Sequence, residues 1–427
     1  MIKIIKDKLE NRQEIFSAFT EKPNVSEIVS EIIETVKNQG DKALKFYTEK
    51  FDKAKLECLK VSDEEITNAI NTVEPEFIAI LEKASKNIRE FHEKQKRVGF
   101  EIKKPQGIVV GQKVIPIERA GIYVPGGTAA YPSTVLMDSI PAVVAGCERV
   151  VMVTPPDKDG KINPVILASA KVAGVTEIYK VGGAQAIAAL AYGTETVPKV
   201  DKIVGPGNAF VAEAKRQVFG EVSIDMIAGP SEIMVIADGT NNAKYIAADL
   251  LSQAEHDKNA SAVLVTDDEA FANAVALELE RQIPLLERSE IARVSIDTNG
   301  KIIITESIEK AVEIANGIAP EHLEICVDEP FKYLNKIKHA GSVFLGKYCP
   351  EAIGDYYAGT NHTLPTSGTA RFSSPLSVDD FIKKTQYVYY DKSALEEVCR
   401  DVEYFAKKEG LTAHAKSAVI RFKEENE

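Results

Sequence analysis

Two short runs of apolar residues, ERVVMVT at 148–154 and EIYKVGG at 177–183, decide the fold. Valine, isoleucine and tyrosine dominate both runs, as they do in β-strands, and the second run ends in a glycine pair. A longer segment with helical spacing of its apolar residues, AQAIAALAYG at 184–193, follows at once. Strands that alternate with helices in this way predict α/β units built around mainly parallel strands.

The same alternation extends outward over about residues 107–347. Further candidate strands are GIVVG from Gly107, EIMVIAD from Glu232, SAVLVT from Ser261 and GSVFLG from Gly341, and helical patterns include STVLMDSIPAVVAG and NAKYIAADLLSQAEH. Two nucleotide-fold-like layers are therefore expected. The first hundred or so residues are charge-rich and helical in pattern, and two or three helices are expected to close the chain.

Composition excludes several classes of protein. The 427 residues are 44% hydrophobic and 27% charged, which is typical of a globular protein with two or three domains. The net charge is -12, from 52 basic and 64 acidic side chains, and no dense run of lysine and arginine suggests a nucleic-acid partner. Charges interrupt the amino-terminal apolar residues, and no later segment holds about 18 apolar residues together. We therefore expect a cytoplasmic protein with no membrane association.

The five cysteines are widely scattered and include no CxxC pair. This spacing favours reduced, structural thiols over disulfides or a thiolate metal site.

Three candidate strands run into glycine-rich turns that precede helices. The turns are YVPGGTAAYPST from Tyr123, VGGAQAIAAL from Val181 and VGPGNAFVAEAKR from Val204. Backbone N–H groups at such helix starts can bind a phosphate, and glycine permits its close approach. The spacing is neither GxGxxG nor GxxxxGK[ST], however, and plain strand-to-helix connections explain such turns more often. The turns alone do not establish a nucleotide site.

Four of the six histidines stand in polar segments next to turns. His256 closes the helical pattern of DLLSQAEHD, and Gln253 lies three residues earlier on the same helix face. His322 follows Glu321 in IAPEHLEI, which places an acid beside a base that can both transfer protons near neutral pH if they are partly buried. Taken alone, a solvated helix end and a surface Glu-His pair are the more common explanations.

The other two polar-segment histidines lie towards the carboxyl terminus. Asp355 and His362 fall in the loop GDYYAGTNHTLPT, and His414 falls in EGLTAHAKS beside Glu409. Long loops more often carry function than packing. A glutamine, two histidines and an aspartate would suit zinc or a similar ion, although their dispersed positions do not establish a site. The remaining histidines stand among lysines and are expected to be solvated surface residues without a role: His92 and His339.

Several of these segments, read in order, resemble the signature segments of histidinol dehydrogenases. They are QAEH at 253–256, APEHL at 319–323, GDYYAGTNHTLPT from 354 and EGLTAHAKS from 409, together with AGPSEI from 228 and GIYVPGG from 121. The resemblance covers nearly the whole chain. It implies a zinc-containing, NAD-dependent homodimer that oxidises L-histidinol through L-histidinal to L-histidine in histidine biosynthesis. The alternatives are a related zinc-dependent dehydrogenase of another amino alcohol or hydroxy acid, and a non-enzymatic zinc-binding or assembly protein.

The resemblance also assigns roles to individual residues. Proton transfer falls to Glu321 and His322. One zinc ion per subunit is expected on Gln253, His256, Asp355 and His414. Substrate contacts are expected from these ligands and His322, and in addition from Ser231, His362 and Glu409. The dinucleotide-contacting positions are Tyr123, Gln185 and Asn208.

The fold that the resemblance implies is α/β, with two incomplete nucleotide-fold-like (Rossmann-like) domains, mainly parallel sheets, a helical amino-terminal lead-in and a carboxyl-terminal tail exchanged within the dimer. The expected division is a helical segment at 1–20, a first α/β domain at 21–122 with 231–375, a dinucleotide-binding α/β domain at 123–230, and a helical tail at 376–427. Glu409 and His414 lie in this tail. The resemblance therefore implies that each site is completed by the partner subunit.

Overall fold

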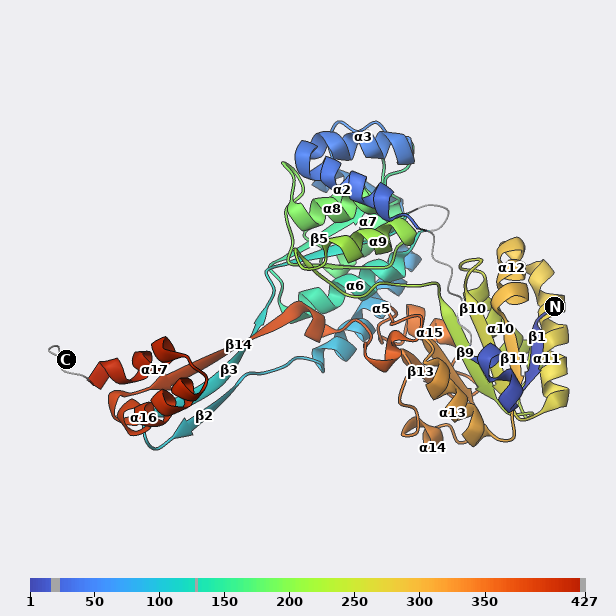
Figure 1. The fold of residues 1–427 in the computed structure, drawn as a ribbon. Helices are drawn as coiled ribbons and strands as arrows, with labels where there is room; N and C mark the ends of the chain where they lie inside the picture. The colour runs from blue at the N-terminus through green and yellow to red at the C-terminus, as the bar shows by residue number, and fades with distance from the viewer. Residues whose placement is uncertain (17–23, 127–129, 423–427) are drawn as a thin grey trace. The chain divides into compact units, whose positions relative to one another are not determined.

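The computed structural model describes residues 1–16, 24–126 and 130–422 (Figure 1). The chain divides into a larger unit, Met1–Gln95 with Ile117–Phe381, and a smaller unit, Lys96–Pro116 with Ile382–Glu427. The larger unit holds a five-stranded and a six-stranded sheet, and the smaller unit holds a three-stranded sheet. Within the described residues, no helix is both long and apolar enough for a membrane crossing.

The five-stranded sheet of the larger unit is parallel throughout, in the order β6-β5-β4-β7-β8. Its strands are β4 (Arg119–Tyr123), β5 (Arg149–Thr154), β6 (Glu177–Lys180), β7 (Lys202–Val204) and β8 (Ser223–Ile224). The helices of this part of the chain are α2 (Ser26–Gln39), α3 (Asp41–Asp52), α4 (Asp63–Thr72), α5 (Pro75–Glu93), α6 (Pro132–Ala145), α7 (Pro164–Ala173), α8 (Gly183–Tyr192) and α9 (Ala209–Val218). Val150–Thr154 of β5 are all buried, which explains the uninterrupted apolar run of this strand.

The strand order of this sheet reverses between β4 and β7. The chain passes outward from β4 through β5 to β6 and then returns through α8 to β7, on the other side of β4. In open parallel sheets, ligands bind outside the carboxyl ends of the strands at such a reversal. Gly205 follows β7 with a φ of 119°, and a Cβ there would lie 2.1 Å from the carbonyl oxygen of Tyr123. Only glycine therefore fits this turn.

The six-stranded sheet is also parallel, in the order β1-β11-β10-β9-β12-β13. Its strands are β1 (Lys3–Lys6), β9 (Glu232–Ala237), β10 (Ser261–Thr266), β11 (Lys301–Ile304), β12 (His322–Cys326) and β13 (Ser342–Leu345). The helices of this part are α1 (Arg12–Ile15), α10 (Ala243–Ala254), α11 (Glu269–Gln282), α12 (Ser289–Asn299), α13 (Ile308–Ile318), α14 (Phe331–Leu334) and α15 (Glu351–Tyr356).

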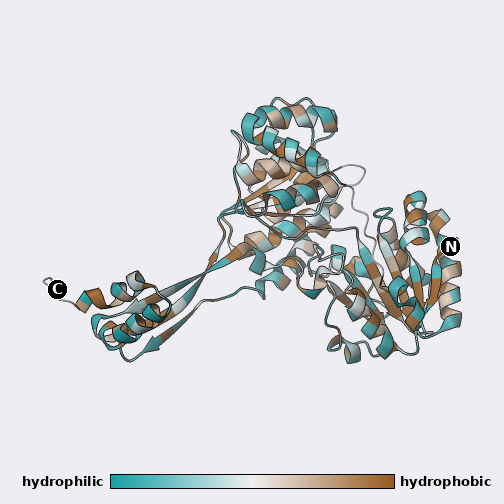
Figure 2. Ribbon diagram, viewed as in Figure 1, coloured by the Kyte–Doolittle hydropathy of each residue, from teal (hydrophilic) through white to brown (hydrophobic). Residues whose placement is uncertain are grey.

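Alternate residues of the central strands β9 and β10 enter different cores. Ile233 and Val235 of β9 pack with residues of α10, α11 and α12, whereas Met234 and Ile236 pack with residues of α13. Both faces of the sheet are therefore covered. Figure 2 shows the result as largely hydrophobic strands between helices that carry a hydrophilic side.

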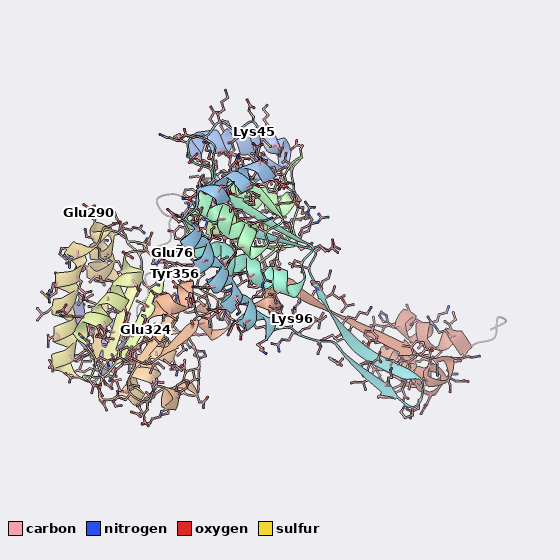
Figure 3. All side chains as sticks on the ribbon, turned by 180° about the vertical axis from the view of Figure 1, so that it is seen from behind. Lys45, Glu76, Lys96, Glu290, Glu324 and Tyr356 are labelled. Carbon is pink, nitrogen blue, oxygen red and sulfur yellow. The ribbon has the colours of Figure 1, made fainter. Side chains whose placement is uncertain are left out.

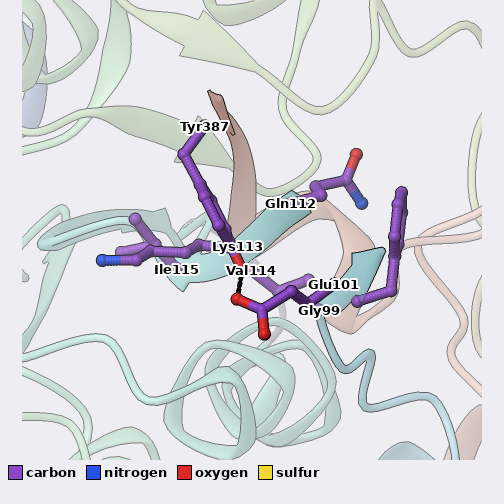
Figure 4. Close-up of a pocket in the computed structure, with 8 residues that line it drawn as sticks. Gly99, Glu101, Gln112, Lys113, Val114, Ile115 and Tyr387 are labelled. Carbon is purple, nitrogen blue, oxygen red and sulfur yellow. Dashed lines mark hydrogen bonds between the residues drawn. The ribbon is translucent and has the colours of Figure 1, made fainter. Parts of the chain in front are cut away.

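The smaller unit contains an antiparallel sheet in the order β14-β3-β2. Its elements are β2 (Phe100–Lys104), β3 (Ile108–Pro116), β14 (Ile382–Tyr390), α16 (Lys392–Lys408) and α17 (Thr412–Val419). The Tyr387 hydroxyl donates a hydrogen bond of 2.9 Å to Glu101 across this sheet (Figure 4). A Cβ on Gly111 would lie 2.3 Å from the Tyr387 ring, so this glycine lets the ring lie flat on β3.

Three predicted elements differ in the structure. GIVVG from Gly107 contributes to β3, which is antiparallel and not part of a parallel sheet. Residues 1–20 are not wholly helical, because β1 pairs in parallel with β11 and buries Ile5. The tail at 376–427 is likewise not wholly helical, since β14 supplies nine of its residues. In each case pairing with a distant strand outweighs the local pattern.

The packing of the amino-terminal helices differs from the expected division as well. That division joins residues 21–122 to 231–375. In the structure, however, buried residues of α2 and α3 share one core with β5, β6, α8 and α9 of the five-stranded sheet. The amphipathic faces of these helices are visible in the sequence, but the choice between two apolar sheets is a tertiary effect.

Candidate active site

A pocket of about 700 Å³ lies in the larger unit between the ends of its two sheets. Tyr123, at the carboxyl end of β4, and Gly205, after β7, line it from the five-stranded sheet. Ser231, which precedes β9, and His322, which begins β12, line it from the six-stranded sheet. The carboxyl edge of one sheet therefore faces the amino edge of the other across a space large enough for a small ligand.

Glu321 and His322 are buried at the edge of the sheet near β9 and β12, with 7% of Glu321 and 3% of His322 exposed. The backbone of Glu232 holds both side chains. Its N–H donates to Glu321 Oε2 at 2.8 Å, and its carbonyl oxygen lies 3.0 Å from His322 Nδ1. Because a carbonyl only accepts, Nδ1 carries a hydrogen and Nε2 is the atom available to take up a proton. The explanation of this pair as a surface dipeptide is thus wrong.

Three carboxylates surround the His322 ring. Its Nε2 lies 3.5 Å from Asp355 Oδ1 and 3.7 Å from Glu351 Oε2, and its Nδ1 lies 3.6 Å from Glu321 Oε2. Glu351 and Asp355 are four residues apart on α15, which places them on one helix face. Asp355 therefore belongs to a helix and not to a loop. Together, His322, Glu351 and Asp355 form a group whose ligand atoms lie within 4.8 Å of one another.

The site carries a surplus of negative charge. Burial alone would lower the pKa of His322, but Glu321, Asp355 and Glu351 raise it to about 10. Burial raises the pKa of Glu321 to about 8, against the opposing effect of His322. In the described part of the chain, the ion pairs of these carboxylates are all made with His322. A divalent cation would relieve this imbalance and compete with the proton on His322, so the donor set fits a metal.

Gln253 and His256, from the end of α10, complete this side of the pocket. Gln253 is 2% exposed, and its Nε2 donates a hydrogen bond to Glu351. Burial lowers the pKa of His256, which favours the neutral imidazole that binds metals. Of the four predicted zinc ligands, three therefore line one pocket with the predicted catalytic pair: Gln253, His256 and Asp355.

The predicted residues of the carboxyl-terminal tail belong to the smaller unit. Glu409 caps the carboxyl end of α16, and His414 lies in α17. Both are exposed in that unit.

The remaining predicted substrate residues, Ser231 and His362, also line the pocket. His362 Nε2 lies 3.4 Å from Thr134 Oγ1 of α6. The residues on either side of His362 are hydrogen-bonded to the same helix. Asn361 Nδ2 donates to the Met137 carbonyl at 2.6 Å, and Thr363 Oγ1 donates to Asp138 at 2.6 Å. The loop that carries His362 is thus held on both sides.

His92 is not the solvated surface residue that the sequence predicted. It is fully buried, its Nδ1 lies 2.7 Å from the Ile88 carbonyl oxygen, and its Nε2 lies 3.4 Å from Asn361 Nδ2. The charged neighbours of His92 in sequence occupy other faces of α5, so composition concealed its position.

The predicted dinucleotide residues gather at the carboxyl edge of the five-stranded sheet. The Tyr123 hydroxyl accepts a hydrogen bond of 3.1 Å from the Gly183 N–H at the start of α8. Asn208 caps α9 by accepting from the Phe210 N–H at 3.0 Å. Tyr123 and Asn208 line the pocket, whereas Gln185 is 1% exposed and does not line it, with no described hydrogen-bond partner for its Oε1.

A buried ion pair that the sequence analysis missed fixes the Gly205 turn. Lys215 and Asp225 are paired, with side chains 2% and 1% exposed. Lys215 Nζ donates to the Gly205 carbonyl at 2.9 Å, and the Gly205 N–H donates to Asp225 Oδ2 at 2.8 Å. Nothing in the sequence marks Lys215. Glu351, also missed, could have been found, because it lies one helical turn before Asp355.

The five free cysteines contribute no ligand to this pocket. Cys326 and Cys399 are buried, as expected of structural thiols, whereas Cys58 is exposed and not a buried hydrophobe.

Comparisons with known proteins give a consistent result. The family model described as histidinol dehydrogenase matches residues 17–422. A Clostridium acetobutylicum protein named histidinol dehydrogenase is 55% identical over 428 residues, which cover 99% of both chains, and a Bacillus cereus protein of that name is 58% identical, with 93% of this chain and 92% of the relative covered. The crystal structure of histidinol dehydrogenase from Elizabethkingia anophelis is similar with a TM-score of 0.93, at 43% identity and 98% coverage of each chain.

Proposed function

The chain belongs to the histidinol dehydrogenase family, and from this premise we propose how its residues divide the reaction between them. The family consists of NAD-dependent oxidoreductases of histidine biosynthesis, and the reaction is oxidation of L-histidinol through L-histidinal to L-histidine with two NAD. The extent of the match does not favour the alternative of a dehydrogenase for another amino alcohol or hydroxy acid. The buried Glu321-His322 pair on the pocket wall carries the proposal of roles.

His322 is the base of both oxidation steps. The Glu232 carbonyl holds its Nδ1, so Nε2 takes the alcohol proton while the carbon gives up hydride. A nicotinamide cofactor, when bound, would supply the hydride acceptor. In the second step the aldehyde must first be hydrated, and Glu321 removes a proton from the attacking water. The protonated His322 returns its proton to the carbonyl oxygen as the water adds, which leaves Nε2 free to receive the hydroxyl proton of the hydrate as the second hydride leaves.

The family implies zinc, and the pocket offers a suitable donor set. Gln253 supplies an amide oxygen, His256 an imidazole nitrogen and Asp355 a carboxylate, and these ligand types suit zinc with positions left for substrate. When bound, zinc supplies a template that fixes the imidazole and amino nitrogens of the substrate. Ser231 and His362 complete the substrate side of the pocket.

The nucleotide is proposed to bind at the strand-order reversal. Tyr123 and Asn208 line this position, Gln185 is buried near the start of α8, and the amino end of α9 lies at the pocket. The Lys215-Asp225 pair keeps the intervening Gly205 turn in place.

The test separates the two half-reactions. Glu321→Gln should mainly impair oxidation of histidinal, because hydration belongs to that half, whereas His322→Asn should impair both histidinol and histidinal oxidation. Loss of a general base costs about a hundredfold to ten-thousandfold in rate. Equal losses in both halves for Glu321→Gln would refute the assigned roles.

We also propose that Glu409 and His414 act in the partner subunit's site of a homodimer. The support is their exposure in the smaller unit together with the family resemblance. Refolding His322→Asn with His414→Ala subunits should return up to half of the wild-type activity per mixed dimer, since one of two sites then carries both defects and the other carries neither. Recovery no greater than the sum of the parents, in verified mixed dimers, would exclude a shared site. Location in the cytoplasm stays a prediction.

A further inference from the structure

We propose that Glu351 is a positioning residue that turns the amide oxygen of Gln253 towards the zinc. This inference rests on the proposed role of Gln253 as a zinc ligand. Glu351 is 3% exposed and lies behind the residues that line the pocket. Its Oε2 accepts a hydrogen bond from Gln253 Nε2, so the contact is with the nitrogen of that amide.

The side of the amide that Glu351 contacts decides what Gln253 can do. A glutamine amide has one oxygen that can bind a metal and one NH₂ group that cannot. A carboxylate that accepts from the NH₂ group leaves the oxygen for the pocket. The reverse orientation would place the amide oxygen against a carboxylate oxygen, with two acceptors facing each other in a buried site. Glu351 therefore selects the ligating orientation.

Glu351 is itself held by elements on two sides. Its backbone N–H donates to Glu324 Oε1 at 2.8 Å, and Glu324, labelled in Figure 3, is fully buried in β12. The Glu324 carboxyl group shares a hydrogen bond with Asp249, which lies one turn before Gln253 on α10. These bonds link α10, β12 and α15. The position of Glu351 relative to Gln253 is thus built into the fold, as expected of groups that orient metal ligands.

The same carboxylate lies 3.7 Å from His322 Nε2 and forms a ligand-like group with His322 and Asp355. A direct metal contact by Glu351 is therefore the competing explanation. Two observations favour positioning: Gln253 Nε2 already occupies Glu351 Oε2, and Glu351 does not line the pocket.

The experiment measures zinc affinity of the metal-free full-length protein by competition with a chromophoric zinc chelator. In Glu351→Gln the new amide can donate as well as accept, so the Gln253 amide is free to turn round. We expect zinc to bind about tenfold to a hundredfold more weakly, and the KM for histidinol to rise while the KM for NAD stays unchanged. The exposed Glu329→Gln is the matched control and should change none of these values.

A swapped pair keeps the test decisive if Glu351→Gln folds poorly. In Gln253→Glu two carboxylates face each other, whereas in Gln253→Glu with Glu351→Gln the donor and acceptor have exchanged places. The double variant has the same net charge as the parent and keeps the hydrogen bond with its direction reversed, so it should bind zinc about as tightly as the parent; a large loss of affinity would contradict the positioning role.

Three further results would overturn the inference. Wild-type zinc affinity in Glu351→Gln, beside a large loss in Gln253→Ala, would refute the positioning role alone. Unchanged affinity in Gln253→Ala would remove the ligand assignment and this inference with it. A zinc-loaded structure with a Glu351 oxygen at a bonding distance of about 2.0–2.2 Å would make Glu351 a ligand instead.

Discussion

Replacing Lys215 by methionine should destabilise the larger unit and weaken NAD binding. Lys215 and Asp225 are almost fully buried, with side chains 2% and 1% exposed, and each holds one backbone group of Gly205. Methionine matches the length of the lysine chain but leaves the Asp225 charge without its partner. Removing one member of a buried ion pair costs about 3–5 kcal/mol.

The paired variant separates the lost charge from lost packing. In Lys215→Met with Asp225→Asn, the single amide oxygen of asparagine can replace only one of the two carboxylate oxygens, which accept from the Gly205 N–H at 2.8 Å and from the Met226 N–H at 2.6 Å. No buried charge is left, so the double variant should be more stable than Lys215→Met alone, with a coupling of about 1–3 kcal/mol.

Urea unfolding followed by circular dichroism gives the free energies, and initial rates give the KM for NAD and for histidinol. The KM for NAD should rise most in Lys215→Met, because Gly205 lines the pocket at the position where we propose that NAD binds. Lys171→Met, an exposed lysine in α7, is the control and should stay within about 0.5 kcal/mol of the parent. A cost below about 1 kcal/mol for Lys215→Met, or strict additivity in the double variant, would refute the role of this pair.

Burial raises the pKa of Asp138 to about 8, so its stabilising contribution is complete below the unfolded pKa near 4 and is lost as the pH rises to about 8. The free energy of unfolding of Asp138→Asn, relative to that of the parent, should therefore increase by about 1.4 kcal/mol per pH unit between pH 5 and 7.5. If urea unfolding gives the same pH dependence for both proteins, the prediction is wrong. Gly205→Ala should lose NAD binding and be less stable than the control Gly220→Ala. Both glycines have positive φ, but only a Cβ on Gly205 would clash with the Tyr123 carbonyl oxygen, since no atom lies within 4 Å of a Cβ on Gly220. Equal shifts in melting temperature for the two variants would exclude this clash. Chelation should abolish histidinol oxidation and added zinc should restore it; full activity in protein shown by elemental analysis to be metal-free would exclude the template role.

The parallel strands could be predicted from the sequence because helices cover both of their faces. Burial on both faces requires an unbroken apolar run, and β5, β9 and β10 each bury every residue after the first. The antiparallel β14, IKKTQYVYY, is largely exposed in its unit and carries no such run. The sequence therefore predicts this segment as part of a helical tail, because an exposed strand without alternation has no local signature.

The site could be predicted only through the family resemblance. Gln253 and Glu351 are 98 residues apart, and Lys215 reaches a carbonyl that belongs to another turn. The spacing of residues along the chain does not predict these two contacts. They depend on how parallel strands bring distant segments to one edge of a sheet. The two titratable groups that sequence reasoning placed side by side, Glu321 and His322, are adjacent in the chain, but their burial was not predictable from the dipeptide.

The opposite orientation of the two sheets gives the pocket a polarity that suits the reaction. At the carboxyl edge of the five-stranded sheet, α9 begins, and a helix amino terminus favours the phosphates of a dinucleotide. At the amino edge of the six-stranded sheet, α10 ends next to Gln253 and His256, and a helix carboxyl terminus favours a cation. Asp355 and the other carboxylates reinforce that side. On the proposed roles, an anionic cofactor and a metal with its cationic substrate are therefore drawn to opposite walls of the pocket, and His322 stands on the metal wall, with its Nε2 3.5 Å from Asp355 Oδ1.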